Sequence, residues 1–161
     1  SHLAETTATR GNSSGHLDRA APKLLRRGIR HVLRYDRPLK KYDSDELHAL
    51  RIACKRLRYT AEFLAPLYAD NLERLHTPVL AMHRLLGDVH DADVYRRRLK
   101  TILGDKPPPS VAKATAIDAL DAHLKAWRKD QLCEATAVWR LLTHRGCTEA
   151  LASVKMSNQA A

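Results

Sequence analysis

The side chains best suited to bind a ligand lie in one short stretch of the sequence. It contains one histidine, four cations and a tyrosine: His48, Arg51, Lys55, Arg56, Arg58 and Tyr59. At ~100° per residue of an α-helix, His48, Arg51, Lys55 and Arg58 fall within a sector of about 80°. Glu62 follows on the same sector, but one carboxylate cannot neutralise three cations. Because Arg and Lys both bind phosphate oxygens, the sequence predicts a site for a phosphate-rich anion here.

This basic stripe needs a helix to position it, and the spacing of apolar residues predicts one over residues 45–68. Its core face comprises Leu47, Leu50, Cys54, Leu57, Ala61 and Leu64. Ile52, Tyr59 and Phe63 lie on the other side of the stripe. Apolar residues on both sides are expected where a stripe lines a groove between helices. Basic helix faces are also commonly solvated, so that alternative stays open.

A second basic stripe is predicted on the preceding helix, over residues 18–35. Lys23, Arg26, Arg30 and Arg34 recur there at helical spacing. Leu24, Leu25, Ile29, Val32 and Leu33 form its apolar face. We expect this second stripe to be the facing wall of the groove, with Arg26, Arg30 and Arg34 opposite the first stripe.

The composition narrows the class of protein. The 161 residues suffice for one domain with a sizeable core, and the mix rich in Ala, Leu and Arg favours helices. The formal charge of +10 favours polyanionic partners. The sequence contains no apolar run of the roughly 20 residues that cross a bilayer, and no secretory signal, so we expect no membrane association and a cytoplasmic location. Three cysteines without CxxC spacing predict reduced, structural thiols.

The order of elements predicts three regions. Residues 1–16 are polar and rich in Gly and Ser, which is typical of a flexible arm or a tag remnant. Residues 17–145 form the helical domain, and residues 146–161 a C-terminal tail. We expect Asp43 or Ser44 to cap the central helix and Pro66 to bend or end it. Further helices are expected over residues 71–86, 94–103, 110–133 and 134–144. We expect Gly87 and Gly146 to end helices, and Asp91 and Ser110 to act as N-caps. Residues 104–110 are rich in proline and predict a stiff connection.

Two motifs resemble the CHAD family, the conserved histidine α-helical domain. The string from His48 to Glu62 is similar to the family's HxLRxxxKRLRYxxE signature, and LLGDVHDADV to its LLGxxNDAxV turn. The resemblance implies an all-α bundle of four to six helices that corresponds to one half of a CHAD domain, because only one signature helix is present. Either two chains pair as a homodimer or an N-terminal half is missing. It also implies binding of inorganic polyphosphate, in the cytoplasm or at polyphosphate granules, through the two stripes.

Two other functions remain as alternatives. The net charge fits non-specific nucleic-acid binding, although few aromatic residues could stack on bases and Tyr59 is expected to be packed. His90-Asp91, with His83, Asp88 and Asp93 nearby, resembles the metal-binding motif of HD-type phosphohydrolases, but a dipeptide is weak evidence. We therefore expect a binding protein and not an enzyme, with no catalytic residue, no metal ligand and no cofactor, and at most weak binding to nucleic acid.

Overall fold

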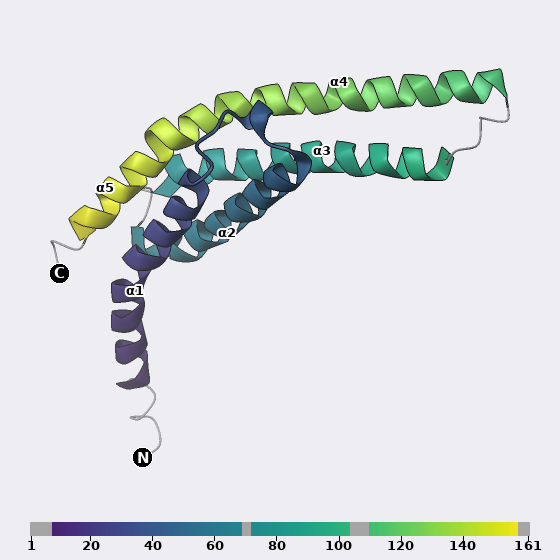
Figure 1. Cartoon of the computed structure of the whole chain (residues 1–161). Helices are drawn as coiled ribbons and strands as arrows, with labels where there is room; N and C mark the ends of the chain where they lie inside the picture. The colour runs from purple at the N-terminus through teal and green to yellow at the C-terminus, as the bar shows by residue number, and fades with distance from the viewer. Residues whose placement is uncertain (1–7, 69–71, 104–109, 158–161) are drawn as a thin grey trace, which may run out of the picture.

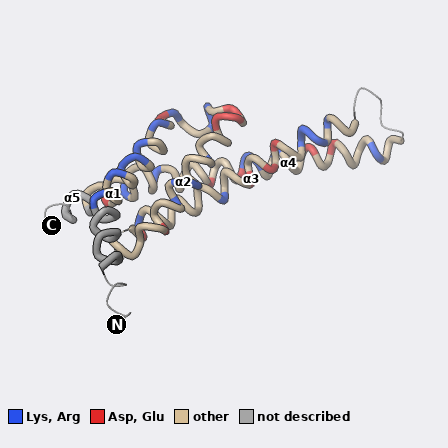
Figure 2. Tube along the Cα trace, turned by 90° about the horizontal axis from the view of Figure 1, so that it is seen from below, with Lys and Arg blue, Asp and Glu red and all other residues tan. Residues whose placement is uncertain are grey.

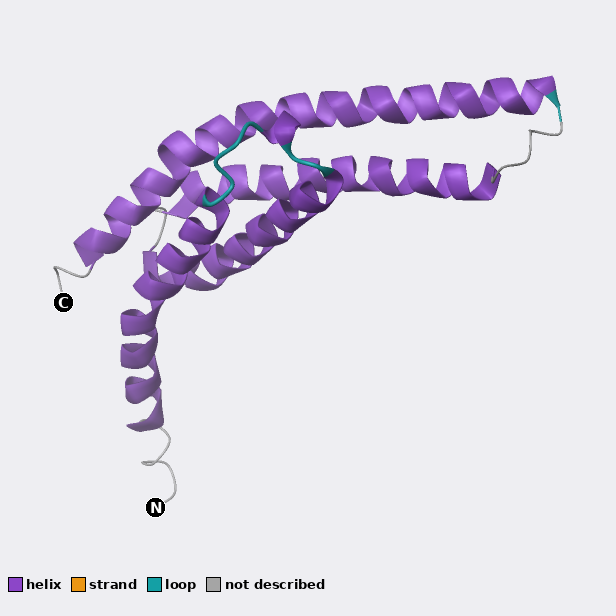
Figure 3. Ribbon diagram, in the orientation of Figure 1, coloured by secondary structure: helices purple, strands orange, loops and turns teal. Residues whose placement is uncertain are grey.

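The computed structural model describes residues 8–68, 72–103 and 110–157. Every regular element in this part of the chain is a helix, which confirms the all-α prediction (Figure 3). The α-helices are α1 (Ala8–Leu33), α2 (Ser44–Tyr68), α3 (Glu73–Leu103), α4 (Val111–Leu141) and α5 (Cys147–Ser157). A 3₁₀ turn, η1 (Leu39–Lys41), precedes α2, and a π-helical segment, η3 (Leu142–Gly146), joins α4 to α5.

Helices α3 and α4 form a long antiparallel hairpin, and α1 and α2 pack against one end of it (Figure 1). The other end projects beyond the bundle and exposes large apolar side chains, with Ile102 81% and Val111 84% exposed. Asp121 accepts a 2.7 Å hydrogen bond from Arg96 across this hairpin, which stabilises the pairing of the two helices. No helix among the described residues is long and apolar enough to cross a membrane.

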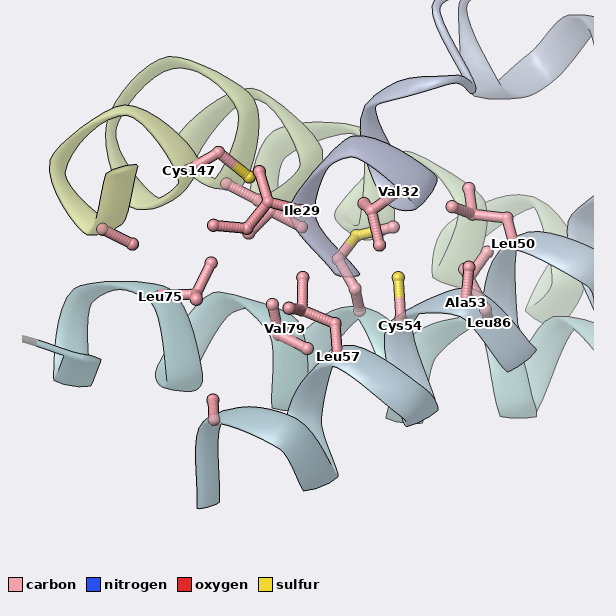
Figure 4. Close-up of a cluster of buried hydrophobic side chains, with 14 of the residues drawn as sticks. Ile29, Val32, Leu50, Ala53, Cys54, Leu57, Leu75, Val79, Leu86 and Cys147 are labelled. Atoms are coloured by element: carbon pink, nitrogen blue, oxygen red, sulfur yellow. The ribbon is translucent and has the colours of Figure 1, made fainter. Parts of the chain in front are cut away.

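The core lies where α1, α2, α3 and α5 meet (Figure 4). All six residues predicted as the core face of α2 are buried, as are Leu25, Ile29 and Val32 of α1. Leu24 and Leu33 of α1 are exposed, so this part of the predicted face is wrong. Burial raises the pKa of Cys54 and of Cys147 to about 12, which keeps both free thiols protonated at neutral pH.

A capping box fixes the start of α2, as the sequence predicts. Glu46 N–H donates to Asp43 Oδ1 at 2.8 Å, and Asp43 N–H donates to Glu46 Oε2 at 3.0 Å. Ser110 likewise caps α4 by accepting a hydrogen bond from the Lys113 N–H. Helix α2 ends at Tyr68, two residues after Pro66, which agrees with the predicted end between Leu64 and Tyr68.

Several predicted boundaries are wrong, in each case because a helix is longer than expected. Helix α1 begins at Ala8, so Gly11 and Gly15 do not interrupt it. Helix α3 runs through Gly87 and Asp91, and the chain stays helical through Gly146 by changing to π geometry. One glycine within a helix costs only about 1 kcal/mol, which tertiary packing readily outweighs. Residues 1–7 of the predicted arm, the prolines of the connection and residues 158–161 lie outside the described part.

Candidate anion-binding site

The buried face of α2 determines where its basic stripe points. Leu50 and Leu57 are fully buried and fix the rotation of the helix about its axis. The stripe then lies at the edge of this core face, beside α3, where His48, Arg51, Lys55 and Arg58 are half-buried. These cations therefore line the junction of two helices and do not form a fully solvated face.

Four nitrogen atoms at this junction are buried without a hydrogen-bond partner among the described residues. Three belong to α2 and one to α3: His48 Nδ1, Arg51 Nε, Arg58 Nε and His83 Nε2. Buried polar groups nearly always have a partner, because leaving one unpaired costs about 1–3 kcal/mol. The two Arg Nε–H groups are donors that an anion could satisfy, and each imidazole nitrogen becomes a donor when the ring is protonated.

Gly87 permits the close packing of Arg51 on α3. A Cβ atom at this position would lie 3.4 Å from Arg51 Nε. A longer side chain would occupy the space that the guanidinium uses. Gly87 therefore leaves room for the Arg51 side chain on the face of α3, where a Cβ atom alone would make an ordinary contact, and it is not the helix terminator that the sequence predicted.

Two histidines of α3 complete the junction. The rings of His48 and His90 lie with their centroids 4.4 Å apart and their planes tilted by 36°. Burial, together with the nearby His90 and Arg51, lowers the pKa of His48. Burial and the charges of Arg51, Arg58 and Lys55 lower the pKa of His83. Both imidazoles therefore favour the neutral form in the free protein.

Carboxylates compensate this cluster only in part. Glu62 Oε1 lies 3.7 Å from Arg58 Nε and 3.1 Å from His76 Nε2. In the described part of the chain, Arg51 and Lys55 take part in no ion pair. The junction thus keeps a positive charge that a ligand can neutralise.

Tyr59 lies on the outer side of these cations. Its ring is 4.4 Å from Arg58 Cζ and 5.9 Å from Lys55 Nζ, which are cation–π distances. Tyr59 is 50% exposed and Phe63 64% exposed, so the prediction that Tyr59 is packed is wrong. The far border of the stripe is an aromatic ridge in contact with solvent.

The basic residues of α1 do not face this junction, which corrects the predicted groove. Lys and Arg recur along α1 (Figure 2). Arg30 and Arg34, however, line a cleft of about 660 Å³ between α1 and α2, together with Arg56. Arg56 lies roughly 140–160° around α2 from Arg51 and Arg58, on the opposite flank. Arg26 is half-buried on α1 and does not line the cleft.

The residues of the HD-type motif do not gather into a metal-binding group. Among the described residues, no group of three or more His, Cys, Asp or Glu side chains is placed so that it could hold a metal ion. His83 and His90 face α2, whereas Asp91 is exposed. Asp93 is buried, accepting 2.7 Å hydrogen bonds from Ser44 Oγ and Arg128 Nε.

The sequence reasoning missed the part that α3 plays in the site. His83, Gly87 and His90 fall within about 60° of one another on a continuous helix. Their spacing of four and three residues was a usable signal. Treating Gly87 as the end of a helix separated the two histidines and concealed it.

The family assignment agrees with this geometry. The CHAD domain family model matches residues 2–100, a span that contains α1, α2 and nearly all of α3. The chain belongs to the CHAD family. Both walls of the α2–α3 junction lie within the matched region, whereas α4 and α5 follow it. No curated protein and no solved structure matches the chain.

Proposed function

We propose that this CHAD protein binds inorganic polyphosphate at the α2–α3 junction. The observation that carries the proposal is a set of four buried nitrogens, three on α2 and one on α3, that have no hydrogen-bond partner among the described residues. Phosphate oxygens would satisfy these atoms, and arginine can bind two of them at once. Successive turns of α2 place cations about 5.4 Å apart, so a phosphate chain could follow the helix without any base being recognised.

The proposal is for binding and not for catalysis. The site consists of cations and imidazoles, and its carboxylate, Glu62, already contacts Arg58 and His76. The arrangement provides charge and hydrogen-bond donors but no paired nucleophile and base.

We place this role in the cytoplasm at polyphosphate granules, and imaging of the tagged protein together with a polyphosphate stain tests that location.

A triple substitution tests the site. Replacing Arg51, Lys55 and Arg58 with Ala should lower the affinity for long-chain polyphosphate at least about a hundredfold, because several charge-assisted hydrogen bonds are lost. Filter binding measures the affinity, and circular dichroism checks the helical content. Unchanged binding by a folded triple variant would refute the proposal.

A matched control separates the site from net charge. Arg97, Lys100 and Lys113 are exposed on the projecting end of the hairpin. Replacing these three with Ala removes the same formal charge far from the junction. We expect this control to lose only a few-fold in affinity, through the weaker general field. Equal losses in both triple variants would mean that no localised site exists.

Nucleic-acid binding is the second candidate, and the exposed ridge of Tyr59 and Phe63 favours it. Two exposed aromatic rings beside cations are suited to stacking on unpaired bases. Competition between polyphosphate and single-stranded DNA at equal phosphate concentration distinguishes the two. We expect polyphosphate to displace DNA, and replacing Phe63 with Ala to weaken DNA binding while leaving polyphosphate binding intact. Preferential retention of DNA would favour the second candidate.

A further inference from the structure

The cleft between α1 and α2 is a separate concentration of positive charge. It measures about 660 Å³, within the range of small-molecule sites. Five basic side chains line it: Arg27, Arg30, His31, Arg34 and Arg56. It lies on the flank of α2 opposite the α2–α3 junction, so one compact ligand could not occupy both places.

Among the residues that the structure describes, no carboxylate lines this cleft. The five basic side chains also form no hydrogen bond and no ion pair within the described residues. Among the described residues, Asp36 and Glu46 line a neighbouring hollow near the end of α1 that shares His31 and Arg34 with the cleft; Asp36 is exposed there and Glu46 pairs with Arg37. The positive charge of the cleft therefore exceeds the negative charge beside it, and an anion is the complementary ligand.

Part of the cleft lining is apolar, which distinguishes the cleft from the α2–α3 junction. Leu24, Gly28 and Ala53 are the apolar lining residues, and Leu24 is 45% exposed. A Cβ atom on Gly28 would lie 2.9 Å from Leu57 Cδ1, so glycine allows α1 to approach α2 closely here. An inorganic phosphate chain has no apolar surface to bury, whereas an organic phosphate does.

We propose that the α1–α2 cleft is a second anion site that takes a compact organic phosphate of the nucleoside triphosphate class. The guanidinium groups of Arg34, which directly follows the end of α1, and of Arg56 on α2 bind the phosphates in this arrangement. The apolar lining residues and the half-buried ring of His31 receive the organic group. This site does not depend on polyphosphate binding at the α2–α3 junction.

Calorimetry with ATP and with inorganic tripolyphosphate tests the proposal. These probes carry similar charge but differ in the organic group, so we expect ATP to bind the wild-type protein more tightly. The double variant Arg34→Ala/Arg56→Ala should lose at least about tenfold in ATP affinity. Leu24→Ser, at an exposed position, should weaken ATP and leave tripolyphosphate unchanged. ATP binding that is absent, or no tighter than that of tripolyphosphate, would overturn the proposal.

Two controls keep this test separate from the test of the α2–α3 junction. Arg97→Ala/Lys100→Ala removes the same charge as the cleft variant and should retain ATP affinity. The Ala variant of Arg51, Lys55 and Arg58 should also retain it. Loss of ATP binding in either control to the same degree as in the cleft variant would refute a separate site. Failure of long-chain polyphosphate binding with intact ATP binding would refute only the proposed function.

Discussion

Acidification should strengthen polyphosphate binding at the α2–α3 junction. His48 faces His90 on α3, and Arg51 and Asp45 on its own helix. His83 faces Arg51, Lys55 and Arg58 on α2. Burial and neighbouring cations hold the pKa of each imidazole below its ordinary 6.5. A bound phosphate chain would place negative charge beside both rings and raise these pKa values again.

The sign and size of the effect follow from proton linkage. Between the lowered histidine pKa of the free protein and the raised histidine pKa of the complex, the complex binds more protons than the free protein does. Affinity therefore rises as pH falls through the pKa of the complex, and it levels off below the pKa of the free protein. Each histidine that titrates fully contributes at most about tenfold per pH unit. His48 and His83 together set an upper limit of about a hundredfold per unit.

Calorimetry at fixed salt concentration between about pH 5 and 8 tests this dependence. Repeating the titration near pH 6.5 in buffers of different ionisation enthalpy gives the number of protons taken up on binding. We expect uptake in the wild-type protein and less uptake in His48→Asn and in His83→Asn. His123→Asn, which changes an exposed residue of α4, is the control. Affinity independent of pH, or equal proton uptake in all variants, would refute the reasoning.

The same lowered pKa values predict a matching loss of stability. Below about pH 6.5 the unfolded chain binds protons at His48 and His83 more readily than the folded chain does. The free energy of unfolding should therefore fall as pH decreases through this range, down to the pKa values of the folded state. Replacing either histidine with Asn should flatten the profile, which urea titrations at several pH values would measure.

Three further substitutions, two of them at Gly87, test the packing around the site. Gly87→Ala should raise the free energy of unfolding by up to about 1 kcal/mol, because glycine is a poor helix former. Gly87→Leu should displace Arg51 and lower polyphosphate affinity at least about tenfold. Filter binding measures this loss, and full affinity in the variant would contradict the assigned contact. Asp93→Ala should destabilise the fold by about 3 kcal/mol in urea, because the half-buried Arg128 and Ser44 lose their acceptor; a loss below about 1 kcal/mol would mean that solvent replaces it.

The sequence was sufficient to predict the features that depend on the residues of one helix alone. The core face of α2 was predictable residue by residue, because a period of 3.6 allows one solution for six apolar positions. The capping box was predictable because Asp43 and Glu46 interact three residues apart. The family signature likewise identified the stripe whose nitrogens are buried at the α2–α3 junction.

What the sequence could not provide was the contact between elements. Gly87 resembled a terminator because a local rule does not register an arginine that crosses from another helix. The wrong prediction that Leu24 and Leu33 are buried had a similar origin. The predicted apolar face of α1 was wider than the surface that α2 and α5 cover. Neither error could be detected without the positions of the neighbouring helices.

The predicted groove failed for a geometric reason that changes how this protein would handle anions. A helix that packs through a central core face has two edges, and periodicity alone does not indicate which edge meets which neighbour. Arg51 and Arg58 lie at the edge beside α3, whereas Arg56 lies at the edge beside α1. The basic residues therefore form two separate clusters around one helix, which differ in lining: buried nitrogens at the first, and apolar residues beside the cations at the second. Because their linings differ, variants at each edge should change the affinity for different phosphate ligands.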